Sequence, residues 1–334
     1  MMLQRNAYKV AMSTHSDEQD PLIATELQPF LGALLQLTEN SPPLNGANLG
    51  FYRKRARVGG SKPLDDVPFE VVEVPDGAGY RSVRLWLVNT NADAPARPAV
   101  LHFHGGGLVM GNCQNSLPRM QGLARALNCA VVSVEYGLAP EVGPNEAQLQ
   151  HQAAVNWLIA QAGNLAINVN RISLLGVSAG GCHAVNLALR CVDNKVVDFS
   201  GMALLYPMLD DRTGSTVMPP AHQGQYLWTA EQNHYGWRTF LGKAPGSDKI
   251  SSHHVPARAK TLSGLPPTFI AVGELDLFYA ENCAFTEKLE AAGIATELYT
   301  VPGAFHAFES VAPQSQLASE FNQRLLQALD RFCH

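Results

Sequence analysis

Short apolar runs alternate with longer amphipathic segments along most of the chain from residue 69 onward. The segment after residue 178 places Ala184, Leu187, Ala188 and Cys191 at i, i+3, i+4 and i+7, which is typical of a helix with one buried face. Short strands flanked by such helices predict a mostly parallel sheet covered on both faces, with two antiparallel strands at its start. The runs expected to form strands are 69–74, 83–88, 99–103, 130–134, 172–177, 202–206, 268–272 and 298–301.

Two stretches break this alternation, and we expect them to form a cap over an α/β core. The first, residues 1–50, contains an apolar helical segment at 23–37 that the Asn-Ser-Pro-Pro cluster at 40–43 ends. The second, residues 209–250, is rich in aromatic side chains, and Thr229 and Gln232 have the spacing of a helix capping box. The core itself is expected to comprise residues 51–208 and 251–334.

Composition narrows the class of protein. The 334 residues are 46% hydrophobic and 16% charged, which suits one large domain with a sizeable core. The net charge is −5 and no Lys/Arg-rich run occurs, so neither nucleic acid nor an anionic membrane is an expected partner. The six cysteines form no C-x-x-C pair and no zinc-ligand spacing, so we expect free thiols and no bound metal.

Neither a secretory signal peptide nor a membrane span is expected from the sequence. The N-terminus lacks the apolar stretch of a secretory signal peptide. No segment approaches the ~20 apolar residues that a membrane span needs. We therefore expect a cytoplasmic protein without stable membrane insertion.

The strongest chemical signal is Gly176-Val177-Ser178-Ala179-Gly180, which matches the pattern G-x-S-x-G between an expected strand and an expected helix. A sharp strand-to-helix turn exposes the serine hydroxyl, and glycines flank it because side chains there would collide with neighbouring elements. The beginning of the helix also favours negative charge nearby. We interpret Ser178 as a nucleophile.

A second signal, His104-Gly105-Gly106-Gly107, comes directly after the expected strand 99–103. Ester hydrolysis passes through a tetrahedral oxyanion, and bare backbone N–H groups can approach that oxygen where no side chain intervenes. Alone, this segment would equally suit a flexible glycine turn. Together with the serine motif it predicts an oxyanion-binding loop.

A serine nucleophile needs a base, and the base needs an acid to orient it, in the chain order Ser, acid, His. His306 lies in a loop after the last expected strand, where an open α/β sheet places its site. Asp276 likewise follows an expected strand and is the leading candidate for the acid. Glu274 is its nearest rival, and Asp210 and Asp211 are weaker ones.

In five segments the chain resembles the hormone-sensitive-lipase-like carboxylesterases of the α/β-hydrolase superfamily. The order and spacing of these segments cover about residues 70 to 310. The matching segments are His104-Gly105-Gly106-Gly107, Tyr136-Gly137-Leu138-Ala139-Pro140-Glu141, Gly176-Val177-Ser178-Ala179-Gly180-Gly181, Gly273-Glu274-Leu275-Asp276 followed by Glu281, and His306 before Ala307-Phe308.

The resemblance implies an α/β-hydrolase fold with a cap and no cofactor. It implies a triad of Ser178, Asp276 and His306. It also implies an oxyanion hole formed by the N–H groups of Gly106, Gly107 and Ala179. A homodimer through the late edge strand 298–301 is suggested by family analogy alone.

The predicted function is that of a serine ester hydrolase whose small-molecule substrates are short- to medium-chain acyl esters. Leu108, Tyr226 and Trp228 are candidates for substrate contact, and packing of the cap would equally explain the two aromatic residues. The same triad would serve an amidase or an acyltransferase. Some proteins similar to this family are non-catalytic small-molecule receptors, but these typically lose the histidine that this chain keeps.

Overall fold

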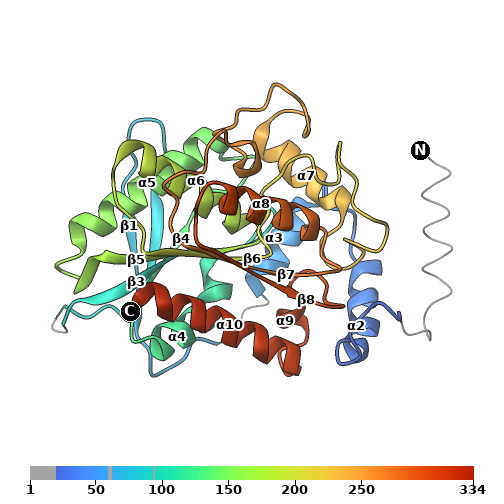
Figure 1. Ribbon diagram of the computed structural model, residues 1–334, viewed down its shortest axis with the longest axis horizontal. Coiled ribbons are helices and arrows are strands. Elements are labelled where there is room, and N and C mark those ends of the chain that lie inside the picture. The colour runs from blue at the N-terminus through green and yellow to red at the C-terminus, as the bar shows by residue number, and fades with distance from the viewer. Residues whose placement is uncertain (1–19, 59–61, 93–94) are drawn as a thin grey trace.

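The computed structural model describes residues 20–58, 62–92 and 95–334, and eight strands among them form one sheet (Figure 1). The order across the sheet is β1-β2-β4-β3-β5-β6-β7-β8. β2 pairs antiparallel with β1 and with β4, and all other neighbouring pairs are parallel. The strands are β1 Phe69–Val74, β2 Val83–Val88, β3 Arg97–Phe103, β4 Ala130–Glu135, β5 Ile167–Val177, β6 Gly201–Leu205, β7 Thr268–Gly273 and β8 Thr296–Val301.

Burial along the strands follows their position in the sheet. β6 and β7 are buried throughout, because helices cover both faces of the parallel part. In β2 the inward positions Val83, Leu85 and Leu87 are buried, whereas β1, at one edge, buries only Val74. β8, at the other edge, is half-buried over most of its length.

Helices form a layer on each face of the sheet (Figure 1). α4 and α10 pack against one face, and α5, α6 and α8 pack against the other. The helices are α2 Gln28–Glu39, α3 Leu49–Val58, α4 Cys113–Ala126, α5 Pro144–Gln161, α6 Ala179–Asn194, α7 Ala230–Leu241, α8 Tyr279–Ala291, α9 Phe308–Val311 and α10 Gln316–Cys333, with a 3₁₀ turn at Pro256–Arg258. None of the helices in the described part of the chain is long and apolar enough to cross a membrane.

α3 and α7 belong to a third apolar cluster, separate from the two sheet faces. This cluster joins Leu49 of α3 and Trp237 and Phe240 of α7 to Leu108 and Val109, in the loop after β3. The two helices are therefore fixed over the carboxyl end of a central strand. That position places them beside the candidate catalytic residues and the glycine loop.

The strands and helices largely match those predicted from the sequence. β1 and β2 have the expected bounds, and β5 begins five residues before the expected 172. α2 begins at Gln28 instead of near residue 23, with Pro29 in its first turn, where the missing N–H of proline has no cost. The capping box of α7 is present, with Thr229 and Gln232 bonded to each other's backbone N–H groups. The helices α3 and α4 and the short α9 were not predicted.

Candidate active site

Ser178 occupies a sharp turn between β5 and α6. Its backbone has φ 53° and ψ −119°, a conformation that non-glycine residues rarely adopt, and its N–H is bonded to the carbonyl of Leu205 at 2.9 Å. The flanking glycines allow close packing: a Cβ on Gly180 would lie 2.1 Å from the carbonyl oxygen of Phe103. The turn therefore requires glycine nearby and presents the serine side chain at the carboxyl end of the sheet.

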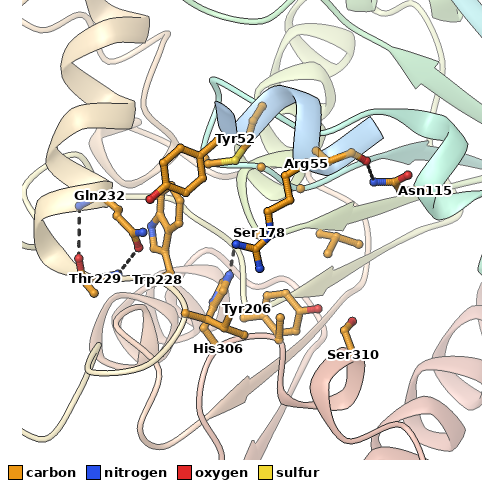
Figure 2. A pocket seen from close by; sticks show the side chains of 18 of the residues that line it. Tyr52, Arg55, Asn115, Ser178, Tyr206, Trp228, Thr229, Gln232, His306 and Ser310 are labelled. Carbon is orange, nitrogen blue, oxygen red and sulfur yellow. Dashed lines mark hydrogen bonds between the residues drawn. The ribbon is translucent and has the colours of Figure 1, made fainter. Parts of the chain in front are cut away.

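A hydrogen-bonded chain joins Ser178, His306 and Asp276. The Oγ atom of Ser178 lies 3.2 Å from Nε2 of His306 (Figure 2). On the other side of the ring, Nδ1 of His306 lies 2.7 Å from Oδ2 of Asp276. The carboxylate of Asp276 is fully buried, and its Oδ1 accepts the N–H of Phe278 at 2.9 Å. These contacts fix the carboxylate, and the carboxylate in turn fixes one ring nitrogen of the histidine.

Aromatic rings hold the imidazole of His306 from two sides. Tyr206 and Phe278 contact it edge to face, with ring centroids 4.7 Å and 5.4 Å away. Tyr206 is itself held, because its hydroxyl donates to Oε1 of the buried Glu309 at 2.5 Å, and Arg119 forms an ion pair with Glu309 at 3.1 Å. No sequence pattern indicated this support, because it joins residues far apart along the chain.

The glycine loop after β3 has room for no side chain. Gly106 and Gly107 have φ values of 130° and 59°. A Cβ on Gly106 would lie 2.0 Å from the carbonyl oxygen of Met110, and one on Gly107 would lie 2.0 Å from the indole of Trp228. Within the described part of the chain, the N–H groups of Gly106, Gly107 and Ala179 have no hydrogen-bond acceptor. They are available to an oxygen atom of a bound molecule.

His104, which precedes these glycines, supports the loop. It is buried, its Nδ1 lies 2.8 Å from the carbonyl oxygen of Gly105, and its ring stacks on Tyr136 at 4.2 Å. The hydroxyl of Tyr136 donates to the carbonyl of His104 at 2.6 Å. Burial lowers the pKa of His104, so the ring is neutral at pH 7 and serves packing.

The rivals of Asp276 have other partners. Asp211 is fully buried and forms an ion pair with Arg258 at 2.5 Å, and Asp210 pairs with Arg212 at 2.6 Å. Neither contacts His306 in the described hydrogen bonds, and nor does the side chain of Glu274. The nearby Glu281 accepts the N–H of Leu209 at 2.6 Å and braces the loop after β6, and burial raises its pKa well above the usual range.

A cavity of about 530 Å³ opens above Ser178 and His306, and its lining is mostly apolar (Figure 2). Trp228 lies on its wall, as does Met110. Two other candidates for substrate contact do not line it in the described structure. Leu108 is only 1% exposed and packs in the cluster with α3 and α7, and Tyr226 directs its hydroxyl to Asp20, to which it donates at 2.6 Å.

A comparison with protein families adds to this geometry. A family model described as alpha/beta hydrolase fold matches residues 100–310, a range that contains the glycine loop, Ser178, Asp276 and His306. The chain belongs to this family. The α/β-hydrolase fold expected from the sequence is therefore confirmed.

Known relatives of this α/β-hydrolase extend over most of its length. An ethyl acetate hydrolase of Pseudomonas putida is 25% identical over 317 residues, which cover 91% of this chain and 99% of that protein. A carboxylesterase of Mycobacterium tuberculosis is 32% identical over 248 residues, which cover 71% of this chain and 74% of that protein. Among solved structures, a bacterial heroin esterase is 30% identical, with a TM-score of 0.84 over 94% of this chain and 99% of its own.

Proposed function

We propose that this α/β-hydrolase is a serine carboxylic-ester hydrolase that works through an acyl-enzyme on Ser178. One observation carries the proposal: the chain from Ser178 through His306 to Asp276 lies at the base of an apolar cavity, with unpaired backbone N–H groups beside it. A nucleophile, a base, an oriented acid and oxyanion donors are the parts that acyl transfer needs. The esterase and carboxylesterase names of its relatives agree with this reaction.

In the acylation half, Oγ of Ser178 attacks the ester carbonyl while Nε2 of His306 removes its proton. The carbonyl oxygen becomes an oxyanion, which the N–H groups of Gly106, Gly107 and Ala179 stabilise. The tetrahedral intermediate then breaks its bond to the alcohol oxygen, and His306 gives its proton to the departing alkoxide. Asp276 holds the imidazole in the correct tautomer and stabilises the imidazolium as it forms.

In the deacylation half, water attacks the carbonyl carbon of the acyl-enzyme, and the same residues assist the reaction. His306 removes a proton from the water, the same oxyanion donors act, and Ser178 is released with the proton back on Oγ. The products are an alcohol and a carboxylic acid. No residue outside this set is needed for a proton step.

We propose that two segments form a cap over the site. Thr38, Tyr52 and Arg55 line the cavity from α2 and α3, and Trp228 and Gln232 line it from the insertion 209–250. Because α3 extends to Val58, the N-terminal part of the cap includes residues after 50. The first nineteen residues of this segment lie outside the described part of the chain. A mostly apolar cavity of about 530 Å³ suits short to medium acyl chains.

The decisive experiment measures hydrolysis of p-nitrophenyl esters from acetate to palmitate by the wild type and by Ser178→Ala. We expect turnover of the short esters and a fall in kcat of about 10⁴-fold or more in the variant, as for other serine triads. Circular dichroism checks that the variant is folded. Full activity of a folded Ser178→Ala enzyme would contradict the proposal. Activity on matched p-nitroanilides that exceeds that on esters would favour an amidase.

We also propose a homodimer through β8. This strand pairs only with β7 and leaves its other edge without a partner within the described chain. Sedimentation velocity would test it: a monomer at all concentrations would rule the dimer out.

A further inference from the structure

Among the described residues that line the active-site cavity, Arg55 is the one with a permanent charge, and none is an aspartate or glutamate. Arg55 extends from α3 into the cavity that Ser178 and His306 also line (Figure 2). An arginine remains charged at any pH in which an esterase works. None of the steps of ester hydrolysis described above uses a cationic side chain. Arg55 is therefore expected to have another function in this mostly apolar cavity.

The charge of Arg55 is not neutralised by the protein within the described contacts. Its Nη1 donates to the hydroxyl oxygen of Ser41 at 3.0 Å, and no carboxylate of the residues that the structure describes forms an ion pair with it. Arg53, two residues earlier on the same helix, shows the contrast, because it holds both carboxylate oxygens of Glu141 at 2.7 and 2.8 Å. A guanidinium has five N–H donors, so Arg55 keeps several for a ligand.

Two buried carboxylates contact residues that line the cavity, and both are engaged by those contacts. Asp276 is bonded to His306, and Glu309 is bonded to Tyr206 and paired with Arg119. Neither is in a position to neutralise Arg55 without giving up those contacts. Within the described contacts, an anion that pairs with Arg55 would therefore come from solvent or from a substrate.

The surroundings strengthen the field of this charge. α3 contains no acidic residue, and beside Arg53, which is paired with Glu141, it carries Lys54, Arg55 and Arg57, although the chain as a whole has a net charge of −5. Arg55 is exposed, so water screens part of its charge, but the apolar walls of the cavity beside it screen charge less than water does. A negatively charged substrate would thus meet a positive patch at this site on a protein that is otherwise slightly acidic.

We propose that this enzyme prefers esters that carry a carboxylate away from the bond to be cleaved, and that Arg55 binds that carboxylate. The inference rests on the proposed function and specifies its substrate class. The planar guanidinium matches a carboxylate with two parallel hydrogen bonds, which a lysine does not reproduce. Arg55 would then determine specificity without touching the reacting atoms.

Matched ester pairs test the preference. p-Nitrophenyl hemisuccinate is compared with p-nitrophenyl butyrate for a carboxylate on the acyl side, and 4-acetoxybenzoate with 4-acetoxybenzamide for one on the alcohol side. Each is assayed with the wild type, Arg55→Gln, Arg55→Lys and Arg57→Gln, which alters an exposed arginine of the same helix that does not line the cavity.

We expect the wild type to favour the anionic member of at least one pair by about tenfold in kcat/KM, equivalent to about 1.4 kcal/mol. Arg55→Gln should abolish this preference, chiefly through a higher KM for the anionic ester, so that kcat/KM falls much more for the anionic ester than for the neutral one. Arg55→Lys should retain part of the preference, and Arg57→Gln all of it. Added salt should weaken the preference of the wild type.

The outcomes separate this inference from the proposed function. Ser178-dependent hydrolysis without preference in either pair, or a preference that survives in Arg55→Gln, would overturn the inference and leave the esterase intact. An equal loss on neutral and anionic esters in Arg55→Gln would mean that Arg55 only braces Ser41, and the inference would again be wrong. If the folded wild type hydrolyses no ester, both fail together.

Discussion

At the scale of single residues, Gly107 is the clearest test of the oxyanion loop. Its φ is 59°, and a Cβ there would lie 2.0 Å from the ring of Trp228. We expect Gly107→Ala to displace the loop and lower kcat by about 10²–10³-fold, which is the usual loss for one oxyanion donor. Steady-state kinetics on a short p-nitrophenyl ester measures the effect.

Gly122→Ala is the matched control, because a Cβ on Gly122 in α4 meets nothing within 4 Å. This change should leave kcat unaltered and stabilise the helix slightly. A Gly107→Ala enzyme with the wild-type kcat would show that the loop is not part of the oxyanion hole.

The sequence indicated the three residues of the proposed triad but not the residues that support them. The motif around Ser178 and the positions of Asp276 and His306 after expected strands were sufficient to select three side chains that the structure brings together. The contact between Tyr206 and Glu309 joins residues 103 positions apart. Tyr206 ends an ordinary apolar run, and Glu309 lies in a short helix, so no local pattern marks either as a support for His306.

At the scale of elements, Arg53 links α3 to the loop that follows the glycines. Its Nε donates to the carbonyl of Val109 and its Nη2 to that of Ala139, each at 2.8 Å, in addition to the pair with Glu141. The Glu141 side chain is 52% exposed, so most of the stabilisation comes from the two carbonyl contacts.

We expect Arg53→Gln to reduce the free energy of unfolding by about 1–2 kcal/mol, since two carbonyls lose a charged donor. Because α3 lines the cavity, KM for esters should rise more than kcat falls. Urea unfolding and steady-state kinetics give the two quantities. Lys54→Gln, an exposed neighbour on α3, should change neither. A large fall in kcat with KM unchanged would argue against a role for α3 in substrate binding.

Of the helices missing from the sequence prediction, α9 has only four residues, and α3 and α4 have compositions that obscure a helical pattern. α4 contains Pro118 and Gly122 within its length, and both residues normally indicate a break. α3 is polar around most of its circumference and rich in basic residues, so its apolar spacing is weak. Tertiary contacts fix both helices, and these contacts depend on segments distant in the sequence. The strands, by contrast, have continuous apolar runs that a buried sheet requires.

At the scale of the whole molecule, four histidines outside the proposed triad are buried beside β3, namely His102, His104, His151 and His183. Burial lowers the pKa of His102 and of His151 to about 3, with smaller contributions from neighbouring positive charges. The same cause lowers the pKa of the other two. The folded protein therefore keeps these rings neutral at pH values where the unfolded chain binds protons.

This difference in pKa between the folded and the unfolded chain determines whether the free energy of unfolding rises or falls with pH. A histidine with an ordinary pKa of 6.5 in the unfolded chain and about 3 in the folded protein contributes nothing above pH 6.5 and destabilises the fold as the pH falls toward 3. Each such group costs about 1.4 kcal/mol per pH unit within that window. We expect the free energy of unfolding to fall on acidification, starting below about pH 6.5, in urea titrations at successive pH values.

His151→Phe isolates the effect, because both ring nitrogens of His151 are buried without a hydrogen-bond partner and the ring contacts Phe103 edge to face at 5.0 Å. The difference in stability between this variant and the wild type should grow in favour of the variant as the pH falls from 6 to about 4, by about 1.4 kcal/mol per pH unit. His222→Gln, at an exposed histidine, should give a difference independent of pH. A His151→Phe difference that is equally flat would mean that the folded protein protonates this ring as readily as the unfolded chain does, and acid sensitivity would have to arise from the carboxylates.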